Sequence, residues 1–242
     1  MQSAKYQVMA LAMFLTVSAF TGCLGDDDEE EDVTKTTVMI GFLNPLTGPL
    51  EPDAPGFTWA ATEAISDLNA ASSTHTFELV EVDSGCDGAV AATGAQTLVD
   101  SGVVAVAGAA CSGASMGANA VLSAAGIPMI SYASTNPGLS DASAYPLFYR
   151  NVPSDAIQGP AGADMMTDAG VGNDSLAILH MTNDYGSGLA DSVKAAWEGN
   201  GNSLCASGMQ GYEETTTSFG SLADGIAGNA DCTAVYLSSY IT

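Results

Sequence analysis

The sequence of 242 residues contains very few basic side chains. Lys and Arg together number 4, against 28 Asp and Glu, and the formal net charge is −24. Binding to nucleic acid needs clusters of Lys and Arg that neutralise phosphates, so this composition excludes a nucleic-acid partner. It also excludes charge-driven docking on anionic lipid. A strongly acidic surface keeps a protein soluble in salt water, which is typical of a marine or halophilic source.

Sequence patterns of nucleotide and zinc sites are missing as well. The sequence has no G-x-x-x-x-G-K-[ST] motif, so a phosphate-binding loop for nucleotides is not predicted. It has no C-x-x-C, and its two histidines, His75 and His180, lie far apart in the sequence. Zinc sites need such closely spaced ligands, and we therefore expect no metal and no other cofactor.

The N-terminal segment has the pattern of an export signal. Lys5 precedes an apolar run over 8–20, which is shorter than the ~20 residues of a membrane span. We predict a signal peptide over 1–22, with Cys23 lipidated as in a lipobox and anchored to the outer face of the cell membrane. The alternative is an ordinary cleaved signal with Cys23 as a free thiol. The acidic, polar segment 23–36 is predicted to be a disordered tether.

Four further cysteines form an even set, which favours disulfides in an exported chain. They are Cys86, Cys111, Cys205 and Cys232. Four cysteines allow three pairings. We favour Cys86 with Cys111 and Cys205 with Cys232, because each bridge then stays within one half of the chain.

Strand and helix patterns alternate along the rest of the chain, which predicts an α/β protein with parallel sheets and helices on both faces. A break near Arg150 predicts two similar lobes, 37–153 and 154–242. A Pro/Gly-rich loop is predicted at 45–56, and 145–153 is predicted to be extended. Strands are predicted at 36–43, 76–83, 103–109, 127–134, 175–181, 203–209 and 232–239, and helices at 57–71, 89–101, 115–126, 158–170, 186–201 and 219–228.

The segment "VAGAACSGASMGANA" at 106–120 admits two interpretations. Gly113 to Gly117 fits G-x-S-x-G, the turn that presents a hydrolase serine, here Ser115. However, Ser115 falls about six residues after the strand, and His180, the only downstream histidine, lies inside another strand. Ser112, between strand and helix, instead fits an anion cradle of helix N–H groups and a hydroxyl, or a simple helix cap. The cradle has better geometry than the hydrolase turn, and this segment alone favours the cradle and the simple helix cap equally.

The chain resembles the periplasmic branched-chain amino-acid binding proteins, the type I solute-binding proteins of ABC importers. The resemblance runs from about Thr37 to Tyr240. It is carried by "LTGPL", the spaced pair "GCD" and "ACSG", "ISYASTNPGLS", "YRNVPSDAIQGP" and "LHMTNDYGSGLA". It implies the two-lobed type I fold, with an incomplete second lobe because the family continues beyond this length. It also implies a Cys86–Cys111 bridge.

The resemblance implies a set of ligand contacts in a cleft between the lobes. Ser112 would hold the ligand carboxylate, and the Ala133 carbonyl would accept from the ammonium. Thr135 would contact both charged groups, and Asp155 would pair with the ammonium. Asp155 also fits the N-cap of the helix at 158–170, a role that could coexist with binding. Two second-lobe residues would close over the ligand, Tyr185 and Tyr240.

One departure concerns the first loop, where Pro52 and Asp53 stand about where the family often has an aromatic residue. The side-chain pocket is therefore expected to be more polar, or to favour another amine-bearing ligand. The predicted function is an extracytoplasmic, lipid-anchored binding protein that delivers a branched-chain or other small amino acid, or an amide, to ABC permease subunits without chemistry. The alternatives are a sensor ectodomain of the same fold and, remotely, a serine hydrolase that uses Ser115.

Overall fold

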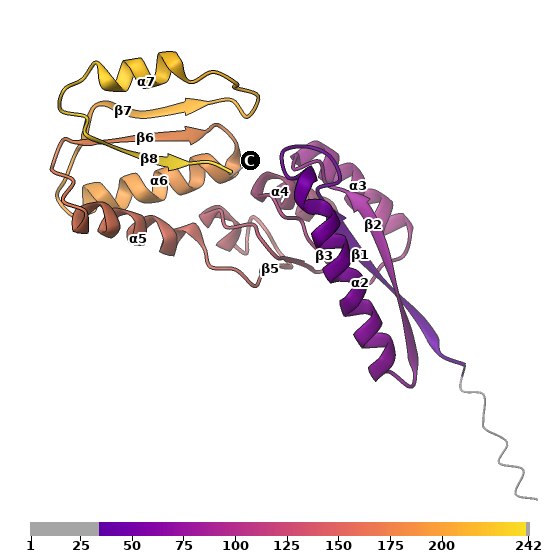
Figure 1. The fold of residues 1–242 in the computed structure, drawn as a ribbon. Coiled ribbons are helices and arrows are strands. Elements are labelled where there is room, and N and C mark those ends of the chain that lie inside the picture. Colours follow the sequence, from indigo (N-terminus) through magenta and orange to yellow (C-terminus); the bar gives the residue numbers. More distant parts are fainter. Residues whose placement is uncertain (1–33, 241–242) are drawn as a thin grey trace, which may run out of the picture. The chain divides into compact units, whose positions relative to one another are not determined.

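The computed structural model describes residues 34–240. The predicted signal peptide over 1–22, the predicted lipidation at Cys23 and the tether up to 33 lie outside the described residues. Residues 36–242 form one compact unit, which contains two parallel β-sheets (Figure 1). Within the described residues, no helix is long and apolar enough to cross a membrane.

The first sheet has five parallel strands in the order β2-β1-β3-β4-β5. The chain places β2 on one side of β1, and then β3, β4 and β5 on the other side. The carboxyl ends of β1 and β3 therefore mark a topological switch point, where parallel sheets bind their ligands. The strands are β1 (Thr36–Asn44), β2 (His75–Asp83), β3 (Ala105–Ala107), β4 (Met129–Ser131) and β5 (Phe148–Arg150).

Three helices accompany this sheet: α2 (Ala54–Ala71), α3 (Gly88–Asp100) and α4 (Ser112–Ala124). Right-handed crossovers place α2 on the face opposite α3 and α4. The main core of this lobe lies under α3 and α4, where Leu98 and Leu122 are fully buried against the strands. Burying a leucine contributes about 1.5–3 kcal/mol, so this layer stabilises the strand ends that bear the site.

The second sheet has three parallel strands in the order β7-β6-β8, so its switch point lies between β6 and β8. Along β6, Leu176 and Ile178 pack with Trp197, whereas Ala177 packs with Ile226. This alternation buries both faces of the sheet under helices. The elements are α5 (Asp155–Asp168), β6 (Leu176–Met181), α6 (Asp184–Gly199), β7 (Leu204–Tyr212), α7 (Gly220–Ala227) and β8 (Ala234–Ser238).

Several helices begin about three residues earlier than the sequence predicts. The predicted loop at 45–56 is wrong from residue 51, because a 3-10 helix (Glu51–Asp53) leads directly into α2. Helix α4 begins at Ser112 and α5 at Asp155. In α5 the cap is Ser154, whose hydroxyl accepts from the Ala156 N–H at 3.2 Å. Asp155 is therefore the first helical residue, and its interpretation as the N-cap is wrong.

The strands β3 and β4 are shorter than predicted, because the backbone after each one turns toward the site. Gly108 has φ +115°, in the region that favours glycine, and a side chain there would meet the Leu43 carbonyl. After β4, the Ser131 hydroxyl donates to the Ala109 carbonyl at 2.5 Å and accepts from the Ser134 N–H at 2.8 Å. Hydroxyl bonds of this kind replace the strand ladder and fix both strand ends.

Candidate functional site

The two switch points contribute to one pocket of about 230 Å³, called the interlobe pocket here. The carboxyl edge of the first sheet supplies most of the lining, and the second sheet and α5 supply the rest. No charged side chain of the described residues lines it. The lining residues are Leu50, Ala110, Cys111, Ser112, Ala133, Thr135, Gln158, Tyr185 and Tyr240. Five of the six residues expected to contact a ligand are therefore brought together.

Ser112 lies at the N-terminus of α4, with 1% of its surface exposed. Its Oγ accepts a hydrogen bond from the Asn136 N–H at 3.2 Å, which leaves the hydroxyl hydrogen available to donate. The first N–H groups of a helix have no intrahelical partner and carry the positive end of the helix dipole. Together they form a cradle that can hold a carboxylate without Lys or Arg.

The residue before Ser112 ties this cradle to the loop between β2 and α3. Cys111 is the N-cap of α4, and its side chain is joined to Cys86 in the loop after β2. The Cα–Cα distance of 5.1 Å is ordinary for a disulfide. Cys205 and Cys232 are joined in the second lobe, with a Cα–Cα distance of 5.3 Å. The structure thus contains the pairing that the sequence favours.

Ala133 and Thr135 lie in the loop after β4. The Ala133 N–H donates to Ser131 Oγ at 3.2 Å, and this bond fixes the orientation of the peptide. The Thr135 hydroxyl donates to Asp155 Oδ2 at 2.9 Å, and the Thr135 carbonyl accepts from the Asp155 N–H at the same distance. Thr135 Oγ1 therefore keeps its lone pairs for a donor in the pocket.

Asp155 is the one expected contact that does not line the pocket. It is completely buried behind Thr135, and its Oδ1 has no hydrogen-bond partner. Burial raises the pKa of this carboxyl, and the bond from Thr135 and the charge of Arg150 offset part of that effect. A buried carboxylate with an unpaired oxygen is an unusual arrangement, since such groups are normally satisfied.

Tyr185 and Tyr240 form the side of the pocket contributed by the second sheet. Their rings stack at a centroid distance of 5.2 Å and an interplanar angle of 5°. Burial is the main cause that raises the pKa of both hydroxyls, and Asp155 contributes at Tyr185. Both hydroxyls are therefore neutral donors at physiological pH.

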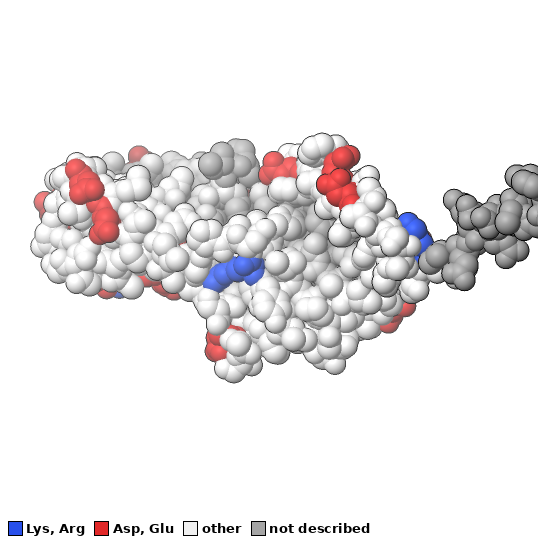
Figure 2. Space-filling view, turned by 90° about the horizontal axis from the view of Figure 1, so that it is seen from below, with Lys and Arg blue, Asp and Glu red and all other residues white. Residues whose placement is uncertain are grey.

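Behind this tyrosine pair lies a second hollow of about 350 Å³ with an acidic lining. Its carboxylates come from both lobes. These four carboxylates make the hollow electronegative, and acidic side chains also predominate over basic ones on the face shown in Figure 2. The carboxylates are those of Asp87, Asp184, Glu213 and Glu214.

Two lining residues were missed in the sequence. Gln158 lies three residues after Asp155, so both occupy one face of α5, and its side chain bonds to Tyr236. The loop after β1 contributes Leu50, whereas Pro52 and Asp53 are exposed in the 3-10 helix. The expectation of a more polar wall at this loop is therefore wrong.

The serine of the G-x-S-x-G match cannot reach a substrate. Ser115 is completely buried, with its Oγ 2.8 Å from Ser134 Oγ and 3.2 Å from the Ala109 carbonyl. His180 lies on β6, where its Nδ1 is 2.8 Å from the Met181 carbonyl oxygen. Among residues 34–240, no group of three His, Cys, Asp or Glu is placed to hold a metal.

Comparisons with known proteins agree with this geometry. The family described as receptor family ligand binding region matches residues 59–221. The leucine-specific-binding protein of Salmonella typhimurium is 28% identical over 207 residues, 84% of this chain and 53% of that protein. The Leu/Ile/Val-binding protein of Citrobacter freundii is 32% identical over 159 residues, 65% of this chain and 43% of that protein.

A solved structure has the same fold. It is the branched-chain amino acid transporter substrate binding protein LivJ from Streptococcus pneumoniae in complex with isoleucine, with a TM-score of 0.71 and 25% identity. The alignment covers 84% of this chain and 57% of that one, and the chain spans about half the length of the curated relatives. The two-lobed type I fold predicted from the sequence is confirmed. These relatives are binding proteins and not enzymes, in line with the prediction of a site without chemistry.

Proposed function

Because the chain belongs to the family of receptor ligand-binding regions, we propose that it binds a small amino acid, branched-chain or similar, or an amide, in the interlobe pocket. The observation that carries this proposal is the pairing of two opposite sites in one uncharged pocket. One is the α4 cradle with Ser112, and the other is Thr135 with Asp155 behind it. The leucine-binding and Leu/Ile/Val-binding relatives support the same ligand class.

The physical requirement is that both charges of a zwitterion be satisfied in a pocket that excludes water, since an unpaired buried charge is costly. The ligand carboxylate accepts from Ser112 and the first N–H groups of α4. The ammonium donates to the Ala133 carbonyl and to Thr135 Oγ1. Asp155 acts through Thr135: it fixes the direction of that hydroxyl and supplies the compensating negative charge.

The walls of the pocket would contact the side chain of the ligand. Leu50 and Ala110 offer apolar surface to an aliphatic side chain. Tyr185 and Tyr240 close over the ligand from the second lobe, as a hinged two-lobe protein does when it binds. Gln158 contributes a side-chain amide to the pocket lining, which also suits an amide-bearing ligand.

For the whole protein, we propose export and membrane attachment. A signal peptide over 1–22 and a lipid on Cys23 would hold the protein on the outer face of the cell membrane, and the two disulfides suit that oxidising compartment. ABC permease subunits would receive the ligand. We keep the lobe boundary between 153 and 154, because β5 ends at Arg150 and α5 begins at Asp155.

The test is calorimetric titration with matched ligands. L-leucine, L-isoleucine and L-valine should bind. 4-Methylpentanoate, which lacks the ammonium, and isopentylamine, which lacks the carboxylate, should bind at least tenfold more weakly. Equal binding of 4-methylpentanoate would remove Thr135 and Asp155 from the site, and no binding to any amino acid or amide would refute the proposed ligand class.

A sensor ectodomain of the same fold is a second candidate, since the matching family is described as a receptor family. The transporter proposal expects the ligand-loaded protein to stimulate ATP hydrolysis by permease and ATPase subunits encoded beside it. Neighbouring genes for a signalling kinase, and no such stimulation, would favour the sensor.

A further inference from the structure

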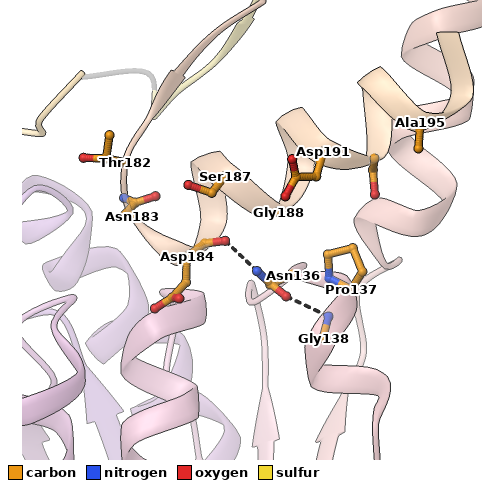
Figure 3. A pocket seen from close by; sticks show the side chains of 11 residues that line it. Asn136, Pro137, Gly138, Thr182, Asn183, Asp184, Ser187, Gly188, Asp191 and Ala195 are labelled. Carbon is orange, nitrogen blue, oxygen red and sulfur yellow. Dashed lines mark hydrogen bonds between the residues drawn. The ribbon is translucent and has the colours of Figure 1, made fainter. Parts of the chain in front are cut away.

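Asn136 of the first lobe is hydrogen-bonded to Asp184 of the second lobe (Figure 3). It lies in the loop after β4 of the first lobe. Its side-chain Nδ2 donates to the Asp184 carbonyl of the second lobe at 2.5 Å, and its Oδ1 accepts from the Gly138 N–H at 2.7 Å. Its backbone N–H donates to Ser112 Oγ at 3.2 Å. One residue thus contacts the cradle and the start of α6 together.

The first two turns of α6 are shaped to sit close to this residue. A Cβ on Gly188 would lie 2.4 Å from Asn136 Nδ2, a distance that real Cβ atoms do not show. A Cβ on Gly113 of α4 would lie 2.6 Å from Asp184 Oδ2. The Asp184 carboxylate therefore rests against the positive N-terminus of α4, where a negative charge is favourable.

We propose that Asn136 is a positioning residue that couples ligand binding at Ser112 to the closure of the second lobe. The proposal rests on the proposed function and assigns the contact that holds the closed lobes together. The backbone bond from Asn136 occupies an acceptor site of Ser112, which turns the serine hydrogen toward the pocket. The side-chain bond fixes Asp184, and Tyr185, the next residue, is thereby held over the same pocket.

Substitutions at Asn136 separate the two roles. Asn136→Ala keeps the backbone bond to Ser112 and removes the bond to Asp184. Asn136→Asp also keeps an acceptor for the Gly138 N–H but places an oxygen against the Asp184 carbonyl. Loss of one hydrogen bond corresponds to about 2- to 10-fold in an equilibrium constant. Both variants should raise the ligand dissociation rate in stopped flow by about that factor, with the association rate nearly unchanged.

The matched control is Asn69→Ala. Asn69 also makes two side-chain bonds, both to Phe77, at 2.9 and 2.7 Å and within the first lobe. This control should lower the midpoint of thermal unfolding and leave the dissociation rate unchanged. If Asn69→Ala and Asn136→Ala change the dissociation rate equally, the effect of Asn136 is general stability and the proposal is wrong.

A ligand-free test uses Gly188→Ala, whose new methyl group should clash with Asn136. In the Asn136→Ala background the two nearest obstructing atoms are gone and only Pro137 Cδ, at 3.3 Å, remains, so Gly188→Ala should lower the unfolding midpoint far less than in the wild type. Equal effects in both backgrounds would refute the interlobe contact. A coupled result in a protein that binds no amino acid would uphold the contact and refute the proposed function.

Discussion

Replacing Asp155 by Asn should separate the stability of the protein from its affinity for ligand. In the free protein Asp155 is a buried carboxyl with an unpaired Oδ1. Leaving such a group unsatisfied costs about 1–3 kcal/mol, and more when the group is charged. The neutral amide still leaves one unpaired polar atom but no unpaired charge; it gives up the attraction of Arg150 and about 0.3–1 kcal/mol that the charge gains at the N-terminus of α5. Because the unpaired charge is the larger cost, we expect Asp155→Asn to raise the free energy of unfolding by about 1 kcal/mol at pH 7.

The same substitution should weaken ligand binding. Without the negative charge behind Thr135, the ligand ammonium is buried uncompensated, which corresponds to about 2 kcal/mol or a Kd about 30-fold higher. The assay is thermal unfolding with and without L-leucine. For a domain of this size, 1 kcal/mol moves Tm by about 2–4 °C. Without ligand, the Tm of the variant should be about 2–4 °C above that of the wild type, and L-leucine should raise the Tm of the variant by less.

The difference in stability between the wild type and Asp155→Asn should change with pH. Burial raises the pKa of Asp155 above its ordinary value of 3.8, so the folded state takes up this proton more readily than the unfolded state. The resulting stabilisation is full below pH 3.8 and is lost as pH rises through the raised pKa. The wild type should therefore approach and overtake the non-titrating variant as pH falls. A variant that is less stable at pH 7, with unchanged affinity and a pH-independent difference, would refute this reasoning.

Three further variants test the remaining parts of the site. Ser112→Ala should raise the Kd for L-leucine about 2- to 10-fold in calorimetry, because one donor to the carboxylate is lost. Ser115→Ala should lower the unfolding free energy by about 1–3 kcal/mol in urea titration and leave the Kd unchanged; an esterase activity that disappears in this variant would revive the hydrolase. Cys86→Ser together with Cys111→Ser should cost about 3 kcal/mol for a bridge with a sequence separation of 25, and an unchanged Kd for L-leucine in this variant would contradict a role of the bridge at the cradle.

Much of the fold could be predicted because strand and helix patterns alternate along the sequence. β1 and β2 appear within one residue of their predicted ends: β1 contains a near-continuous apolar run, whereas β2, at the edge of the sheet, alternates apolar and polar residues. The helix starts could not be located as well. Ser154 and Asp155 are polar residues that fit a loop as well as a first turn, and only the bond from the Ala156 N–H shows that the cap is Ser154.

The site was predictable to the extent that it lies at strand ends. Ser112, Thr135 and Tyr185 each follow a strand, and parallel strands collect such residues at one edge. Asp155 is buried behind Thr135 because of how the side chains pack, and the spacing of residues in the sequence does not reveal such packing. Leu50 was missed for a related reason: the 3-10 helix turns Pro52 and Asp53 out to solvent and leaves the preceding leucine in the wall.

The cap of α4 has a consequence for where in the cell the protein can hold its ligand. Cys111, the N-cap of α4, is joined to Cys86 by a disulfide. Glutathione and thioredoxin keep such thiols reduced in the cytosol, so this bridge forms only in an oxidising compartment. Under the proposed function, export would therefore complete the binding site as well as deliver the protein. A protein that acts as proposed would then withdraw no amino acids from the free pool of the cell that makes it.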